Sequence, residues 1–169
     1  MEELFDVFDR SGNYLGVKPK SFCHSNNPGV YHKPVWVWIC NSKGEVLLQK
    51  RSPNKKWFPN RWDSSATGHV TAGETMISGC QREIFEEIGL NLKEQDIKFV
   101  GEYVADAVWE IGQVYKAVAD VEIADMSVQV EEVAELKWVT FDELEKLIYT
   151  ENFMPYDKAY KDWIVKKLK

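Results

Sequence analysis

Three carboxylates gather in the stretch QREIFEEIGL, which runs from Gln81 to Leu90. In a helix, Glu83, Glu86 and Glu87 would lie on one side, where like charges repel by roughly a few tenths of a kcal/mol per pair. A magnesium ion would relieve that repulsion, because magnesium takes oxygen ligands from a few carboxylates together with substrate phosphates. The spacing alone, however, is more often that of a solvated acidic face.

The periodicity around these acids predicts a helix over residues 76–88. Thr75 can cap its start, and Gly89 can close its end in a left-handed conformation. Glu87 lies at the edge of the apolar stripe, and the other two acids lie well away from it. Gly79, one turn before Glu83, leaves room either for a ligand or for close packing. The stripe consists of Ile77, Cys80, Ile84 and Ile88.

A longer pattern encloses the acids, GHVTAGETMISGCQREIFEEIGL, over residues 68–90. It resembles the Nudix box, the signature of the Nudix hydrolase superfamily, and a chance match to so many fixed positions is very improbable. Strands before and after the box extend this resemblance over most of the chain. The specified positions are filled by Gly68, Glu74, Arg82, Glu83, Ile84, Glu86, Glu87, Gly89 and Leu90.

The resemblance assigns roles to these residues. It implies Mg²⁺ or Mn²⁺, held by the Gly68 carbonyl and by the carboxylates of Glu83, Glu86 and Glu87. Arg82 would orient the neighbouring glutamate. The general base varies within the family, and either of the first two glutamates can serve.

Residues around this core of the site have supporting roles by the same resemblance. Glu74 would fix the loop against the helix, and Gly89 would end the helix. A further acid from a later loop often completes the metal site. Among Glu131, Glu132 and Glu135 we favour Glu132, with ordinary surface charge as the alternative for each.

A second resemblance points to the isopentenyl diphosphate isomerase branch of the superfamily. It is carried by the N-terminal segment DVFDRSGNYLGVKPKSFCH and by KRSPNKKWFPNRWD with the following GH. It implies that Arg51 and Lys55 hold a substrate diphosphate, with His69 as a further substrate-binding candidate; ordinary loop charge is the alternative. In that branch a histidine cluster binds a metal, and His24, His32 and His69 fall near the matching places. Separate structural histidines are the alternative interpretation.

Two departures from the isomerase pattern favour hydrolysis. Thr67 stands where the isomerases carry a catalytic cysteine, and Gln113 stands where they carry an acid. Neither side chain transfers protons well. The acid set of the box is complete, whereas isomerases tend to have a degraded version. The resemblance therefore implies hydrolase machinery on an isomerase-type scaffold.

The elements that must position these residues form an α+β fold, an α/β/α sandwich with a mixed sheet between helices. We expect a single Nudix domain over residues 1–169, opening with a hairpin at about 1–20. Trp36 and Trp38 share a strand face and serve either packing or stacking. Strands are expected at 30–40, 45–51, 97–109, 113–123 and 135–139, a loop at 52–63, and further helices at 141–149 and 154–169. In the last helix we expect Pro155 near the first turn and a stripe through Ala159, Trp163 and Ile164.

Composition excludes several other classes of protein. A net charge of −6 over 169 residues disfavours a nucleic-acid polymer as partner. No apolar run is long enough to span a membrane, and the start lacks the pattern of a signal peptide, so we expect the cytoplasm. Three cysteines without a CxxC pair argue against a disulfide framework.

The sequence thus predicts a metal-dependent Nudix hydrolase. Its substrate would be a nucleoside diphosphate derivative or a related small organic diphosphate, cleaved at a phosphoanhydride bond. A homodimer is possible. The alternatives are an isopentenyl diphosphate isomerase and a non-catalytic module that senses a diphosphate metabolite.

Overall fold

The computed structural model describes all 169 residues and is built around one mixed β-sheet. The strands are β1 Leu4–Phe8, β2 Tyr14–Pro19, β3 Tyr31–His32, β4 Pro34–Cys40, β5 Glu45–Arg51, β6 Trp62–Asp63, β7 Ala66–His69, β8 Ile97–Ala105, β9 Glu110–Val118 and β10 Val133–Thr140. The helices are α1 Lys20–Cys23, α2 Met76–Ile88, α3 Phe141–Leu147 and α4 Lys158–Leu168, with single 3₁₀ turns at Glu94–Asp96 and Ile123–Asp125.

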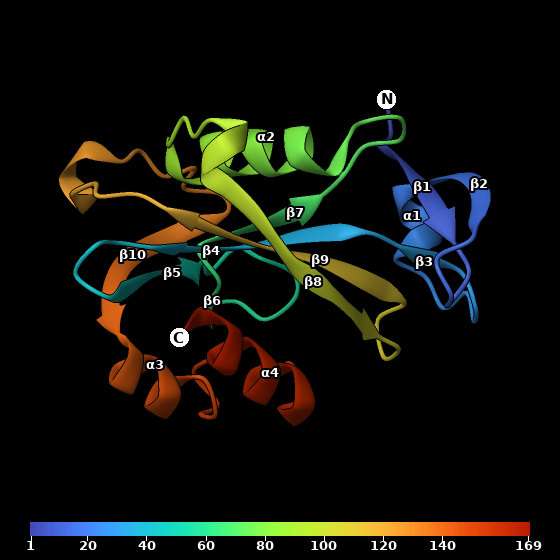
Figure 1. The fold of residues 1–169 in the computed structure, drawn as a ribbon. Coiled ribbons are helices and arrows are strands. Elements are labelled where there is room, and N and C mark those ends of the chain that lie inside the picture. The colour runs from blue at the N-terminus through green and yellow to red at the C-terminus, as the bar shows by residue number, and fades with distance from the viewer.

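The sheet is ordered β10-β5-β4-β9-β3-β1-β2, with β6 beside β5, β7 beside β4 and β8 beside β9. Its central strand, β4, pairs in parallel with β9 and antiparallel with β5 and β7. Helix α2 covers one face, and α3 and α4 cover the other (Figure 1). The predicted α+β sandwich with its N-terminal hairpin is confirmed.

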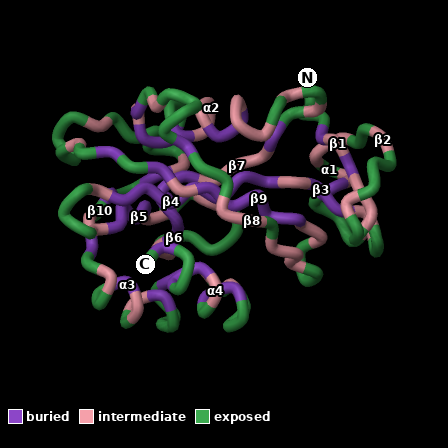
Figure 2. Tube along the Cα trace, in the orientation of Figure 1, coloured by how far each residue is buried: buried purple, intermediate pink, exposed green.

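Each face of the sheet has its own apolar core, and the buried residues concentrate on the central strands (Figure 2). Below α2 the core includes Cys80, Ile84 and Ile88, three of the four residues of the predicted stripe. On the opposite face, Trp36 and Trp38 pack against α4, where the indole Nε1 of Trp38 donates to the Tyr160 hydroxyl at 3.2 Å. The two tryptophans therefore serve packing.

Helix α2 begins and ends where its caps predict. The Thr75 hydroxyl accepts a hydrogen bond from the Ser78 N–H at 3.2 Å, and Gly89 adopts a φ of 73°. At Gly79, an added Cβ would lie 2.8 Å from Val70 Cγ2. This glycine therefore allows close packing of the helix on the preceding loop, rather than room for a ligand.

Several predicted boundaries need correction. The last helix begins at Lys158, because the Asp157 carboxylate caps it by accepting from the Tyr160 N–H at 2.8 Å. Pro155 therefore precedes the helix, and Ala159 is exposed. The buried face of α4 consists of Tyr160, Lys161, Ile164, Val165 and Leu168.

Other differences concern the strands. The strand expected at 30–40 is divided into β3 and β4, where Pro34 has no N–H to continue the ladder. The strand expected at 97–109 ends at Ala105, since residues 106–109 form the turn into β9, which itself ends at Val118. Helix α1 was not predicted, and the end of the expected loop forms β6. No helix combines the length and apolar character needed to cross a bilayer.

Candidate metal and diphosphate site

Arg82 organises the acidic side of α2. Its guanidinium donates to both carboxylate oxygens of Glu74, from Nε at 3.0 Å and from Nη2 at 2.9 Å. Nη1 donates to Glu83 at 2.7 Å and to Glu86 at 3.3 Å, and Nη2 also donates to the His69 carbonyl at 2.9 Å. One planar cation thus fixes the loop before the helix and orients two of the three box carboxylates, Glu83 and Glu86.

Gly68 and Glu83 are in direct contact across the β7–α2 interface. A Cβ at Gly68 would lie 2.0 Å from the Glu83 Cδ and 2.2 to 2.3 Å from its oxygens, so only glycine permits this approach. Burial raises the pKa of Glu83 to about 7, although Arg82 acts in the opposite direction.

Glu87 is buried, with 5% of its surface exposed. Its Oε2 accepts from Gln49 Nε2 at 2.8 Å and from the Thr67 backbone N–H at 2.9 Å. Burial raises the pKa of Glu87 to about 8. The sequence did not single out Gln49, because its contact depends on how β5 lies under α2.

The three carboxylates fit a divalent cation. They come from one side of the helix, and the single cationic side chain that contacts them, Arg82, bonds to Glu83 and Glu86, whereas Glu87 has only neutral donors. Oxygen donors of this kind suit magnesium or manganese. The candidate cation ligands are therefore Gly68, through its carbonyl, and Glu83, Glu86 and Glu87.

The three histidines meet at one place. Ligand atoms of His24, His32 and His69 all lie within 4.8 Å of one another, and His24 Nε2 lies 3.1 Å from His69 Nε2. Both ring nitrogens of His32 are buried without a hydrogen-bond partner. Burial, together with the neighbouring histidines, holds the pKa of His69 well below its usual range, which favours the neutral imidazole that binds metals.

Two further residues complete this histidine cluster. Glu110 lies 3.4 Å from His32 and 3.9 Å from His69. It is brought there by parallel pairing of β3 with β9, which sets His32 opposite Glu110. Phe5 of the hairpin stacks on His69, with ring centroids 4.9 Å apart.

The loop over residues 52–61 is held in place by hydrogen bonds from Arg51. Arg51 donates from Nε to the Phe58 carbonyl at 3.1 Å and from Nη2 to the Trp57 carbonyl at 3.0 Å, and its Nη1 lies 3.7 Å from Asp63. Arg51 therefore shapes the loop over residues 52–61. Its third nitrogen makes no hydrogen bond.

Lys55 forms an ion pair with Glu132. The Glu132 carbonyl accepts from the Ser52 N–H at 2.8 Å, which ties the later loop to the end of β5. The Glu132 carboxylate makes no bond to the box residues. The structure therefore brings together two predicted residues, Lys55 for the substrate and Glu132 for the metal, and the loop that carries Glu132 is bonded to the end of α2 through the Gln129 N–H and the Glu87 carbonyl at 3.0 Å.

The residues that depart from the isomerase pattern have ordinary structural contacts. Thr67 lies on β7 and supplies its backbone N–H to Glu87. Gln113 is buried and donates to Glu102 at 2.9 Å and to the Ile111 carbonyl at 3.2 Å. Neither contact provides an acid or a base.

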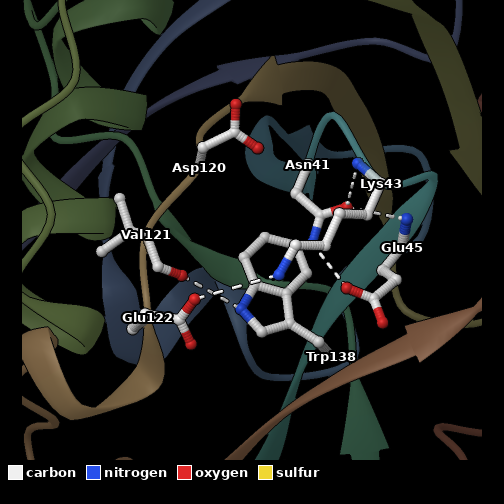
Figure 3. A pocket seen from close by; sticks show the side chains of 7 residues that line it. All are labelled: Asn41, Lys43, Glu45, Asp120, Val121, Glu122 and Trp138. Carbon is white, nitrogen blue, oxygen red and sulfur yellow. Dashed lines mark hydrogen bonds and ion pairs between the residues drawn. The ribbon is translucent and has the colours of Figure 1, made fainter.

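The pocket of about 300 Å³ in Figure 3 lies away from this chemistry. Gly68 pairs with Val35 near the start of β4, whereas Asn41 follows the end of that strand. The lining residues are Asn41, Lys43, Glu45, Asp120, Val121, Glu122 and Trp138. Several of them are bound to one another, as where the indole of Trp138 donates to the Val121 carbonyl at 3.2 Å.

Comparison with known proteins finds the NUDIX domain over residues 30–162. An uncharacterised Nudix hydrolase of Listeria innocua is 40% identical over 133 residues, which cover 76% of this chain and 75% of that protein. An isopentenyl-diphosphate delta-isomerase of Corynebacterium diphtheriae is 31% identical, with 98% of this chain and 91% of that protein covered.

A prenyl-diphosphate phosphatase of Methanosarcina mazei is 28% identical, with 98% of this chain and 95% of that protein covered. The crystal structure of DR0079 from Deinococcus radiodurans shares the fold, with a TM-score of 0.75 at 22% identity, covering 98% of this chain and 99% of that one. The chain belongs to the Nudix hydrolase superfamily, in the branch that resembles isopentenyl diphosphate isomerase.

Proposed function

We propose that this protein is a metal-dependent hydrolase of a small organic diphosphate. One observation carries the proposal: the carboxylates of Glu83, Glu86 and Glu87 are all present on one side of α2, the first two are oriented by Arg82, and Glu83 packs against Gly68, where only glycine fits. A divalent cation on these ligands supplies neutralisation of the diphosphate oxygens and lowers the pKa of an attacking water.

The side chains of the protein position the ligands, accept a proton and bind the phosphate. Arg82 holds Glu83 and Glu86 in place, and either glutamate can take the proton of the water. Glu86 is half exposed and lies at the longer distance from Arg82, which leaves it more freedom to meet substrate. Lys55 supplies a point charge for a phosphate once its pair with Glu132 opens.

The proposed substrate class is the one expected from the sequence. A nucleoside diphosphate derivative or a related small organic diphosphate supplies the phosphoanhydride bond that this site requires. The Methanosarcina mazei relative, which is a prenyl-diphosphate phosphatase, supports the inclusion of prenyl diphosphates in the test panel. We place the activity in the cytoplasm, in a single domain over residues 1–169; a homodimer stays a prediction.

The test is product release from a panel of nucleoside and prenyl diphosphates with Mg²⁺ or Mn²⁺. We expect Glu83→Gln and Glu86→Gln each to lower kcat, by about 100-fold or more for the residue that acts as base. Glu94→Gln, at an exposed position in the turn after α2, is the matched control. Absence of turnover on the whole panel, or full activity in both site variants, would refute the hydrolase proposal.

The assembled histidine cluster keeps isomerase activity as a second candidate. Imidazole ligands favour a metal such as zinc or iron over magnesium. Uptake of deuterium from heavy water into isopentenyl diphosphate distinguishes the two reactions. Because Thr67 and Gln113 replace the proton-transfer groups, we expect no uptake. A non-catalytic sensor would instead be stabilised by a diphosphate without turning it over.

A further inference from the structure

The Glu87 carboxylate is held by only one of its two oxygens. Gln49 Nε2 and the Thr67 N–H both donate to Oε2, at 2.8 and 2.9 Å. Oε1 receives no hydrogen bond from the protein, yet it is not among the fully buried atoms without a partner. One oxygen is therefore fixed, while the other is available at the acidic side of α2.

The side chain of Gln49 is confined by its surroundings. It lies in β5 between two neighbours, opposite Leu136 of β10 and Asp63 of β6, and only 2% of its surface is exposed. Its Nε2 also lies 3.4 Å from the Ser65 carbonyl. Both neighbours of that nitrogen are acceptors, so the amide must present its NH₂ group to them.

A neutral donor has a specific advantage at this place. The guanidinium of Arg82 stabilises Glu83 with a positive charge, and such a charge repels a cation that approaches the same carboxylate. An amide stabilises the ionised carboxylate of Glu87 by hydrogen bonding, without adding charge. Side chains that orient metal ligands in this way typically change metal affinity by about 10- to 100-fold when they are removed.

We propose that Gln49 is a positioning residue for the metal site, which together with the Thr67 N–H fixes Glu87 Oε2 and presents Oε1 to the cation. This inference rests on the proposed metal site of the hydrolase. The direct readout is Mn²⁺ binding followed by electron paramagnetic resonance, which does not require turnover.

Gln49→Met keeps the length of the side chain and removes the donor. We expect the dissociation constant for Mn²⁺ at the box to rise by about 10-fold or more. Gln81→Met is the matched control. Gln81 lies on α2, the helix that carries Glu87, and donates to the Leu92 carbonyl at 2.9 Å, away from the acids. It should bind Mn²⁺ as the wild type does.

A double-mutant cycle separates positioning from a general structural effect. If Gln49 acts through Glu87, Gln49→Met should cause no further loss of affinity in a Glu87→Gln background. Wild-type affinity in folded Gln49→Met, or an equal loss in both backgrounds, would overturn the inference. Mn²⁺ binding that follows this pattern without turnover of any diphosphate would instead overturn the hydrolase proposal alone.

Discussion

At the residue scale, the box acids occupy two electrostatic environments. Glu83 and Glu86 share the positive charge of Arg82, whereas Glu87 is stabilised by neutral donors in a buried place. Arg82 therefore orients two of the carboxylates, and no positively charged side chain bonds to the third. Because the surroundings differ, substitutions next to different carboxylates should have different effects.

Gly68→Ala tests the contact that brings β7 against α2. The new methyl group would overlap the Glu83 carboxylate, so the carboxylate must move away from its position beside Arg82. We expect a loss of hydrolysis on the order of 100-fold, with a change in unfolding free energy of about 1 kcal/mol. Steady-state kinetics and urea unfolding measure the two effects.

Gly44→Ala is the control for this prediction, and we expect it to change stability but not activity. Its backbone has a φ of 77° with nothing near the missing side chain, so alanine there costs stability through strain alone. Activity per folded molecule should remain unchanged. Similar activity losses in the two variants would show that the Gly68 contact is not specific to the site.

Asp63 gives a prediction about pH. It is 1% exposed, its Oδ2 has no hydrogen-bond partner, and burial raises its pKa above the ordinary value. As pH rises from about 4, the unfolded chain releases this proton while the folded protein retains it, so stability falls. Asp63→Asn should remove that contribution.

Urea unfolding at several pH values between 4 and 7 measures the difference. The stability of Asp63→Asn relative to wild type should grow with pH, by at most about 1.4 kcal/mol per pH unit. Asp125→Asn, at an exposed position, controls for the loss of one charge. A difference between Asp63→Asn and wild type that stays constant over this range would contradict the role of burial.

At the scale of elements, the loop over residues 52–61 depends on Arg51. The guanidinium holds the carbonyls of Trp57 and Phe58, and Phe58 adopts a left-handed φ of 51° that is unfavourable for a bulky residue. Arg51→Lys keeps the charge and loses the fork. We expect trypsin to cut after Lys55 or Lys56 several-fold faster.

Mass spectrometry of the first fragments identifies the cleavage site. Lys50→Arg, in which the neighbouring residue of β5 keeps its charge, is the control and should be cut at the wild-type rate. Equal protection of the loop in Arg51→Lys would show that its carbonyl contacts do not hold the loop.

Local signals predicted the elements, and non-local contacts completed the site. Helix α2 could be predicted because its period, its Thr75 cap and its Gly89 end agree, all within one stretch of sequence. Gln49 and Glu110 could not be assigned, because their partners are set by how β5 lies under α2 and by the pairing of β3 with β9. The pairing of Lys55 with Glu132 likewise joins two distant loops.

At the scale of the whole molecule, we expect stability to depend on metal, because one cationic side chain contacts the three carboxylates of the box. A ligand at 100 times its dissociation constant stabilises the folded state by about 2.7 kcal/mol, which corresponds to a Tm increase of about 5–10 °C for a chain of this size. We expect Mg²⁺ or Mn²⁺ to produce such a shift and EDTA to reverse it. Scanning calorimetry measures it.

The double variant Glu83→Gln with Glu86→Gln should lose most of the Mg²⁺ shift. Any shift that Mn²⁺ still produces in that variant would come from the remaining box ligands, Gly68 and Glu87, or from the histidine cluster. An identical Mg²⁺ response in wild type and variant would show that the ion binds elsewhere.

The parallel pairing of β4 with β9 also has a consequence for the protein while it is being made. Val35 pairs with Gln113, about 80 residues further along the chain, so β4 leaves the ribosome long before its partner. At about 5–20 residues per second, this delay lasts roughly 4–16 s. All seven residues of β4 are buried in the finished protein. For those seconds, the edge of β4 that later pairs with β9 has no partner, so one side of the strand at the centre of the sheet is open to chaperones and to other nascent chains.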